Sequence, residues 1–244
     1  MLEALGILFL CFVVCFLLGS IPWGVIISRI FFKKDIRSEG SGNIGTTNAM
    51  RTLGKKGGAA VFLLDFGKGL LAGFIATLFA GWLVAFNPST GMSIATPLLL
   101  GLGYSPSASV FDAGFLSMQL SLAVGFLGCV SGHIYSPWLK FKGGKGIAVA
   151  VGALFFVFGV WGTLAEILIF AILVIATRYV SVGSLAAAVL CPCIALLLYW
   201  GNWLAFACIA LAAILVIIAH RANIDRLYHH CENAIGSKKE AQEN

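Results

Sequence analysis

Residues 185–219 read LAAAVLCPCIALLLYWGNWLAFACIALAAILVIIA and contain no charged side chain. A helix needs about 20 apolar residues to cross the hydrocarbon core of a bilayer, so this stretch is long enough for two helices. Gly201, Asn202 and Trp203 lie near its middle, where glycine relaxes the backbone and tryptophan favours the membrane interface. We therefore predict a hairpin of two membrane-spanning helices here.

The rest of the chain repeats this apolar pattern. Residues 147–176 form a second long stretch with a predicted turn at 159–162, and residues 4–32, 59–86 and 116–138 each suffice for one helix. Hydrophobic residues make up 60% of the chain and charged residues 11%, whereas a soluble domain has about 45–50% and 25%. The sequence thus predicts an all-α, polytopic integral membrane protein with seven transmembrane helices and excludes a soluble globular fold.

Basic residues predict the orientation, because short cytoplasmic loops keep an excess of Lys and Arg. Residues 87–115 contain neither, which places them outside. An odd number of helices then puts the N-terminus outside and the C-terminus in the cytoplasm, in a single domain over residues 1–244 that ends in a disordered tail, 237–244. The basic regions predicted to lie inside are residues 29–58, 140–145, 178 and 221–239.

The net charge and the cysteine residues indicate which partners and cofactors to expect. The formal net charge of +6 suggests anionic partners, either lipid headgroups or a phosphorylated substrate, although the topology alone also explains an excess of basic loops. Seven cysteines, most of them inside predicted helices, give no disulfide framework and no zinc pattern. We therefore expect no metal, no other cofactor and no nucleic-acid partner.

The first basic loop, residues 39–58, reads EGSGNIGTTNAMRTLGKKGG. Its first three glycines fit the G-x-G-x-x-G spacing, but no strand precedes them, so a dinucleotide site is improbable. Glycines still let backbone N–H groups approach an anion, and neutral donors and an arginine stand beside them. This pattern favours phosphate binding over an ordinary flexible loop. The predicted phosphate ligands here are Ser41, Gly42, Asn43, Thr47, Asn48 and Arg51.

The second basic loop, residues 140–146, reads KFKGGKG and stands directly before a helix that begins at Ile147. A helix N-terminus presents unpaired N–H groups and a partial positive charge, which favours a phosphate group there. The spacing is not that of a Walker A loop, so no nucleotide is implied. A topological anchor would explain the lysines but not the glycines between them. The predicted binding residues are Lys142, Gly143, Gly144, Lys145 and Gly146.

Two further regions carry polar side chains at predicted cytoplasmic helix ends. Arg178 lies in a turn where a lone arginine is most often a headgroup anchor, whereas Ser181 can lend a hydroxyl to a site built from other loops. His220 and Asn223 lie three residues apart at the end of the last helix, with Arg226 beyond them. A titratable base, an amide and a cation together suit acyl transfer. The alternative is an amphipathic exit helix on the membrane surface.

Asp65, Lys68, His133 and Glu166 are ionisable residues that fall inside predicted helices. Asp65 and Lys68 are three residues apart and are expected to neutralise each other. His133 lies near the membrane edge and has either a functional or a structural hydrogen-bonding role. Glu166 has no evident partner in the sequence.

The order and content of these loops closely resemble the bacterial acyl phosphate:glycerol-3-phosphate acyltransferase family. The resemblance rests on Gly40 to Gly45 with Arg51, on Gly132 and His133 with residues 140–146, on Arg178 and Ser181, and on His220, Arg221 and Asn223. It covers nearly the whole chain. It implies a multi-pass enzyme of the bacterial cytoplasmic membrane with its active site on the cytoplasmic face.

The resemblance also implies the first reaction of bacterial phospholipid synthesis. An acyl group moves from acyl phosphate to the sn-1 hydroxyl of glycerol 3-phosphate, which gives lysophosphatidate and phosphate. The expected partners are these substrates, membrane lipid and an enzyme that makes acyl phosphate. Ser41 and Arg51 would bind phosphate, Lys142 or Lys145 would hold the glycerol phosphate or the leaving group, and Ser181 would complete the pocket. His220 and Asn223 would position the hydroxyl and polarise the carbonyl.

Two features depart from the family pattern. Ala222 stands where the family usually has a glutamate, with Glu232 or Asp225 as possible substitutes, and the outside segment 87–115 is longer than the family needs. A transporter or a non-catalytic binder of a phosphorylated metabolite or lipid is the alternative. Transporters place polar sites near the bilayer midplane and show internal repeats, whereas these motifs gather at helix ends on one side.

Overall fold

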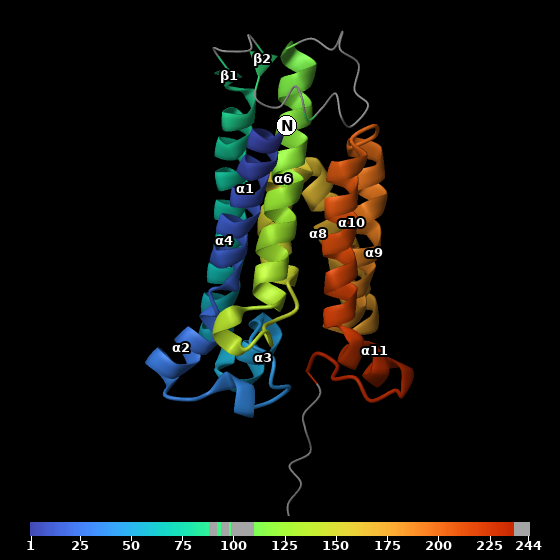
Figure 1. The fold of residues 1–244 in the computed structure, drawn as a ribbon. Helices are drawn as coiled ribbons and strands as arrows, with labels where there is room; N and C mark the ends of the chain where they lie inside the picture. Colours follow the sequence, from blue (N-terminus) through green and yellow to red (C-terminus); the bar gives the residue numbers. More distant parts are fainter. Residues whose placement is uncertain (88–91, 94–97, 99–109, 237–244) are drawn as a thin grey trace, which may run out of the picture.

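The computed structural model describes residues 1–87, 92–93, 98 and 110–236, and it is almost entirely helical (Figure 1). Strands β1 (Phe86–Asn87) and β2 (Met92–Ser93) form a short antiparallel pair in which Phe86 faces Ser93 and Asn87 faces Met92. The α-helices are α1 (Leu2–Ser20), α2 (Trp23–Phe32), α3 (Thr46–Thr52), α4 (Gly54–Val84), α6 (Val110–Ile134), α7 (Ile147–Val157), α8 (Gly159–Thr177), α9 (Val180–Leu198), α10 (Trp203–Ala219) and α11 (Arg221–Tyr228), and the 3-10 turns are Ile36–Ser38 and Pro137–Leu139.

The all-helical, polytopic architecture is confirmed. Within the described part of the chain, five spans are long and apolar enough to cross a membrane, and the bent pair α10–α11 makes six. The seventh predicted helix corresponds to α7, which has 11 residues. At about 1.5 Å per residue it is roughly half as long as the ~30 Å hydrocarbon core.

The predicted helix over residues 4–32 is two helices, α1 and α2. Pro22 has no N–H to donate and forces the preceding residue out of the helical region. Ile21 accordingly has an extended backbone, with φ −60° and ψ 117°. The chain turns there, and α2 lies across the end of the bundle with Ile30 and Phe31 exposed (Figure 1).

Both predicted hairpin turns coincide with breaks between helices. The first break lies between α7 and α8 at Gly159, whose φ of +68° favours glycine. The second lies between α9 and α10, where Gly201 has φ +86° and the Asn202 side chain accepts a hydrogen bond from the Ala205 N–H at 3.4 Å. These caps hold α9 and α10 as antiparallel neighbours.

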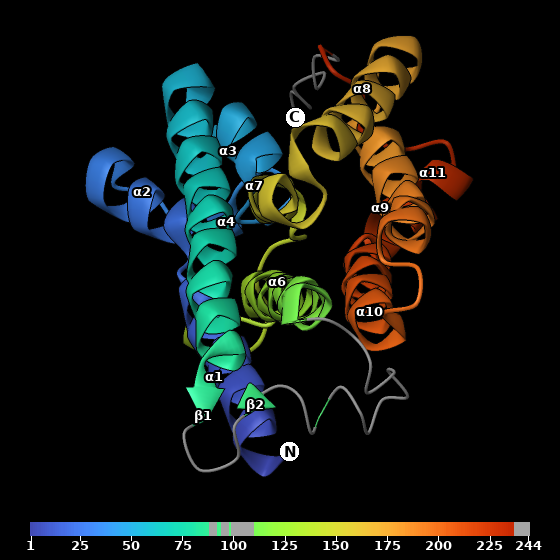
Figure 2. The same cartoon turned by 90° about the horizontal axis from the view of Figure 1, so that it is seen from above.

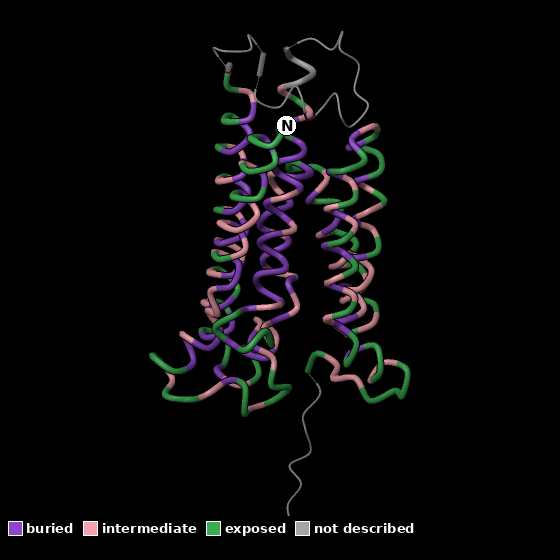
Figure 3. The backbone as a smooth tube through the Cα atoms, viewed as in Figure 1, coloured by how far each residue is buried: buried purple, intermediate pink, exposed green. Residues whose placement is uncertain are grey.

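Helix α6 runs through the centre of the bundle and is mostly buried (Figure 3). Seen from above, α1 and α4 lie on one side of it and α9 and α10 on the other, with α7 between α4 and α8 (Figure 2). Gly128 and Gly132 on α6 lie against the backbone of α1 at Phe12 and Phe16, so that an added methyl group would clash. Small residues spaced four apart let membrane helices approach closely, which explains this packing.

The polar loops gather at one end of the bundle with α2, α3 and α11, while the N-terminus and the β1–β2 pair lie at the other end (Figure 1). Most of the predicted outside segment 87–115 and the predicted tail 237–244 lie outside the described residues. The loops with predicted chemistry therefore converge on a single face of the molecule.

Candidate active site

A cavity of about 540 Å³ opens among the polar loops and continues between the helices. Its walls come from α3, α4, α6 and α7 and from α8, α9, α10 and α11. Most of the polar side chains stand at the loop end, whereas the deeper walls are apolar apart from Glu166. The polar lining residues at this mouth are Ser41, Asn43, Thr46, Thr47, Asn48, Arg51, Lys145, Ser181, Ser184, His220, Asn223, Arg226, Glu232 and Asn233.

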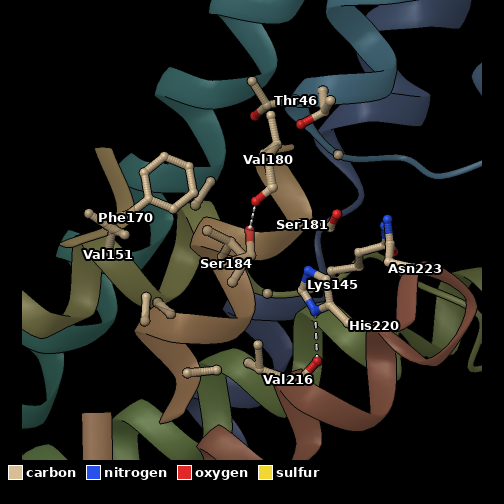
Figure 4. Close-up of a pocket in the computed structure, with 18 of the residues that line it drawn as sticks. Thr46, Lys145, Val151, Phe170, Val180, Ser181, Ser184, Val216, His220 and Asn223 are labelled. Atoms are coloured by element: carbon tan, nitrogen blue, oxygen red, sulfur yellow. Dashed lines mark hydrogen bonds between the residues drawn. The ribbon is translucent and has the colours of Figure 1, made fainter. Parts of the chain in front are cut away.

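His220 stands at the bend between α10 and α11, and its side chain points into the cavity (Figure 4). It is 2% exposed, and its Nδ1 lies 2.8 Å from the Val216 carbonyl oxygen. A carbonyl oxygen can only accept, so Nδ1 carries the proton and Nε2 is left as an acceptor. The imidazole is therefore held in the form that can accept a proton or a hydrogen bond from a hydroxyl group.

Lys145 begins a chain of four side chains at the mouth. Its Nζ donates to Asn223 Oδ1, and Asn223 Nδ2 donates in turn to Glu232 Oε1 at 3.0 Å. Arg226 Nε completes the chain by donating to Glu232 Oε2 at 2.8 Å. The two cations flank one carboxylate, which leaves a net positive charge beside the cavity.

The charge of Lys145 depends on pH near neutrality. The pKa of Lys145 is lowered from 10.5 to about 8, mainly by burial and then by the positive charge of Arg226, while Glu232 acts in the opposite direction. Below pH 8 the ammonium is charged, and above it the amine becomes neutral. The positive potential at the mouth therefore weakens as pH rises through 8.

We expect binding of an anionic substrate to weaken over the same pH range. KM for glycerol 3-phosphate, the phosphorylated substrate implied by the resemblance, should rise up to about tenfold from pH 7 to pH 9, because each pH unit above a pKa lowers the protonated fraction tenfold. Steady-state kinetics would measure it. In Lys145→Arg the guanidinium stays charged, so this rise should disappear; a rise of the same size in that variant would contradict the assignment.

Two buried hydroxyl groups in the cavity wall have no hydrogen-bond partner within the described residues. These are Thr46 Oγ1 and Ser181 Oγ. Ser184 differs, because its hydroxyl donates to the Val180 carbonyl at 2.9 Å (Figure 4). Unsatisfied buried polar groups are costly and rare, so Thr46 and Ser181 indicate a ligand that supplies acceptor oxygens.

The first loop is held in shape by Asn48, which is 2% exposed. Its amide nitrogen donates to the carbonyls of Ile36, Glu39 and Asn43, and its Oδ1 accepts from the Ser41 N–H at 2.8 Å. These bonds give Asn48 a structural role in the loop, and the residue also lines the cavity. They also place Ser41 and Asn43 at the mouth.

Arg51 lies on the last turn of α3 and is exposed. It lines the cavity and donates to the Asn233 carbonyl at 3.3 Å. This bond connects the first loop to the segment after α11, so that the rim of the mouth is formed by parts of the chain far apart in sequence.

In the second loop only Lys145 and Gly146 line the cavity, while Lys142 is exposed and outside it. The N–H groups of Gly143 and Gly144 donate to the Ile134 and His133 carbonyls at 2.9 and 3.0 Å. A side chain at either glycine would clash with His133. The structure therefore explains these two glycines by close packing, which differs from the predicted phosphate cradle.

His133 belongs to a buried cluster behind this loop. Lys68 Nζ lies 2.8 Å from Asp65 Oδ1, 2.8 Å from the Ile21 carbonyl oxygen and 2.9 Å from His133 Nδ1. The predicted pairing of Asp65 with Lys68 is confirmed. The cluster fastens α4 to α6 and to the α1–α2 turn.

Arg178 does not line the cavity. Its guanidinium donates to the Ile235 carbonyl at 2.9 Å, and its own carbonyl accepts from the Ile235 N–H at 2.8 Å. Arg178 thus anchors the segment after α11 to the α8–α9 turn.

The structure brings most of the predicted site residues together at one mouth and adds others. Thr46, Ser184 and Asn233 line the cavity without having been predicted. Thr46 carries a signal, since a threonine opens a helix directly after the glycine-rich run. Asn233 contributes through its backbone carbonyl, for which the sequence gives no signal. The predicted residues that line the cavity are Ser41, Asn43, Thr47, Asn48, Arg51, Lys145, Gly146, Ser181, His220 and Asn223, and those that do not are Gly42, Lys142, Gly143, Gly144 and Arg178.

Ala222 is exposed on α11 and does not line the cavity, whereas the carboxylate of Glu232 is nearly buried beside it. We therefore expect Ala222→Glu to change turnover less than about twofold, as for most surface substitutions. Glu232→Ala should lower it at least about tenfold, because Arg226 and the Asn223 amide lose their acceptor. Kinetics of both variants would test this, and a large gain in Ala222→Glu would contradict it.

Comparisons with known proteins agree with this geometry. The sequence model of a family described as glycerol-3-phosphate acyltransferase matches residues 9–230. A glycerol-3-phosphate acyltransferase of Rhodopseudomonas palustris is 37% identical over 241 residues, covering 96% of this chain and 100% of that protein. One from a Bradyrhizobium species is 35% identical over 228 residues, covering 93% and 94%.

Two solved structures also match. One is the crystal structure of PlsY, an integral membrane glycerol 3-phosphate acyltransferase, in its glycerol 3-phosphate form. It is 31% identical, with a TM-score of 0.71 over 94% of this chain and 96% of that one. The lysophosphatidic acid form has a TM-score of 0.68 over 94% and 95%.

Proposed function

Because the chain belongs to the glycerol-3-phosphate acyltransferase family, we propose that it transfers an acyl group from acyl phosphate to the sn-1 hydroxyl of glycerol 3-phosphate. The products are lysophosphatidate and inorganic phosphate, in the first step of bacterial phospholipid synthesis. The related PlsY structures hold glycerol 3-phosphate and lysophosphatidic acid. No metal or other cofactor takes part in the proposed reaction.

One observation carries this proposal: a single cavity joins a cationic mouth to an apolar interior. Arg51, Lys145 and Arg226 stand at the mouth, where phosphate groups of both substrates find charge-assisted hydrogen bonds. The deeper walls include Leu154, Ile167 and Phe170 and match a hydrocarbon chain. An acyl phosphate has these two parts in the same order.

The reaction needs one proton transfer and no covalent enzyme intermediate. The sn-1 oxygen attacks the acyl carbonyl carbon, a new C–O bond forms, and the bond to the phosphate oxygen breaks with its electron pair leaving on phosphate. We infer that the departing phosphate takes the hydroxyl proton while His220 Nε2 orients the hydroxyl. Lys145 and Ser181 stabilise the negative charge that develops on oxygen.

Asn223 has two roles in this arrangement, one through its neighbours and one in direct contact with the acyl donor. Its Oδ1 holds Lys145, and its Nδ2 is held by Glu232, so it positions the ammonium group. Ser41, Thr46 and Arg51 come from the opposite wall and bind phosphate. The second hydrogen of Asn223 Nδ2 remains for the carbonyl oxygen of the donor.

We propose that the chain crosses the membrane seven times. This topology is supported by the alternation of helix ends between the two faces along α1, α4, α6, α9 and α10 (Figure 1), while the short α7 and α8 lie between α6 and α9 in the chain. The basic loops all lie on the face of the cavity mouth, which the positive-inside rule assigns to the cytoplasm. The N-terminus is then outside and the C-terminus inside, in one domain of the bacterial cytoplasmic membrane.

The decisive experiment compares donors. Purified protein in lipid receives glycerol 3-phosphate with either palmitoyl phosphate or palmitoyl-CoA, and phosphate and lysophosphatidate are both measured. We expect turnover with palmitoyl phosphate alone. Turnover with palmitoyl-CoA alone would show that the acyl donor is a thioester and not acyl phosphate. No turnover with either donor would overturn the proposed reaction.

Arg51→Ala tests the proposed phosphate contact of Arg51 in the same assay. We expect at least about a tenfold loss of turnover, because a hydrogen bond to a charged group contributes roughly 1.5–3 kcal/mol. Arg37→Ala is the control, since Arg37 is paired with Asp35 at 2.6 Å and does not line the cavity. Equal losses in the two variants would contradict a phosphate contact at Arg51.

A further inference from the structure

Glu166 lies in the middle of α8 and lines the apolar depth of the cavity. Most of α8 faces outward, and Thr163 and Glu166 are its buried residues. Glu166 is 2% exposed. The reaction proposed above does not use this carboxyl group.

Neither carboxyl oxygen of Glu166 has a hydrogen-bond partner within the described residues. The other side chains that line the cavity deep in the bundle include Leu154, Ala188, Cys191 and Ala213, which offer at most a weakly polar thiol. Buried polar groups in proteins are almost always paired, and an ionisable residue inside a membrane helix marks a functional site by default. Its partner therefore has to come from what occupies the cavity.

The depth of Glu166 shows which part of an occupant it meets. It lies near Cys191, which follows Ser181 by ten residues on α9. At 1.5 Å per residue the carboxyl group is about 15 Å below the Ser181 hydroxyl, roughly half the hydrocarbon thickness of a bilayer. This depth equals about one leaflet of the hydrocarbon core, so an acyl chain with its carbonyl at the mouth passes Glu166 in the half of the chain nearer its methyl end.

We propose that Glu166 determines specificity for the acyl donor and that the cavity prefers a chain with a hydroxyl group in the half nearer its methyl end. The inference rests on the proposed function and names the donor class of the same site. A hydroxyl group both donates and accepts, so it pairs with a carboxyl group in either protonation state. A plain hydrocarbon chain at the same place leaves both oxygens unpaired.

The test uses the full-length protein in lipid with palmitoyl phosphate and a series of monohydroxy derivatives. The hydroxyl is moved one carbon at a time along the half of the acyl chain nearer its methyl end. We expect one position to be preferred over the plain chain by about five- to tenfold in kcat/KM, the effect of one net hydrogen bond. Glu166→Leu should abolish this preference while keeping activity with the plain donor. Glu166→Gln, which still donates and accepts, should keep much of it.

Thr163→Val is the matched control, because Thr163 is buried on the same helix and its hydroxyl already donates to the Gly159 carbonyl at 2.7 Å. It should leave the preference unchanged. The same donor ratios in the unmodified protein and in Glu166→Leu would overturn the inference. Loss of the preference in Thr163→Val as well would also overturn it, since the effect would then not be specific to Glu166.

A binding measurement separates this inference from the proposed reaction. Acyl phosphonates, which keep the phosphate-like head but resist transfer, raise Tm according to their affinity. A hydroxylated phosphonate should raise Tm more than the plain one in the unmodified protein and not in Glu166→Leu. If no acyl phosphate is turned over but this difference in Tm appears, the proposed reaction is wrong and the specificity site at Glu166 is supported. If the two phosphonates raise Tm equally in the unmodified protein, the specificity site is wrong whether or not the reaction occurs.

Discussion

Replacing Lys145 with alanine is expected to lower kcat/KM for glycerol 3-phosphate by about 10²- to 10³-fold, the range for loss of one positioned donor at a developing negative charge. Lys145 lies half-buried at the cavity mouth, and its ammonium group is held by Asn223. Alanine removes the charge and leaves the Asn223 oxygen without its donor. Both substrate binding and stabilisation of the reacting oxygen are lost together.

Lys142→Ala is the matched control for this variant. Lys142 belongs to the same loop and carries the same charge, but it is exposed and does not line the cavity. Its loss should change kcat/KM less than about twofold, as for a screened surface charge. Similar losses in both variants would show that the loop acts through its net charge and not through the Lys145 contact.

Replacing His220 with alanine is expected to lower kcat by about 10²-fold, the effect of misplacing a reacting group. His220 Nδ1 is fixed by the Val216 carbonyl, which aims Nε2 at the cavity. Without it the sn-1 hydroxyl has no acceptor to orient it. KM for glycerol 3-phosphate should change much less, because Arg51 and Lys145 still hold the phosphate.

Added imidazole distinguishes the two roles open to His220. If the donor's phosphate takes the proton, imidazole should not restore activity to His220→Ala, since orientation within the site is missing. Restoration would show that His220 itself is the general base. His229→Ala is the control: His229 is exposed and its Nδ1 lies 2.9 Å from the Asp225 carbonyl oxygen, so unchanged kinetics are expected.

Much of the site could be predicted because its chemistry is local in sequence. Ser41, Arg51, Lys145 and His220 stand in short polar runs between apolar stretches, and such runs must gather at helix ends. Their convergence follows from topology alone. The break at Pro22 was missed because the apolar run continues through it, although proline itself carried the signal.

Other features depend on contacts that no local pattern reveals. Gly143 and Gly144 appeared suited to an anion, yet their N–H groups are bonded to α6 and their small size accommodates His133. The pairing of Glu232 with Asn223 and Arg226 requires the chain to fold back after α11. Glu166 was visible in the sequence, but its unpaired state became clear only once its surroundings were known.

The segment after α11 also sets when the enzyme becomes competent during its synthesis. Glu232 joins Asn223 and Arg226, the Asn233 carbonyl joins Arg51, and Ile235 joins Arg178, so these late residues close the cavity mouth. A nascent chain that has reached only α10 has inserted every described membrane span but lacks these bonds. We therefore expect translation of residues 220–236 to separate insertion into the bilayer from the start of lipid synthesis.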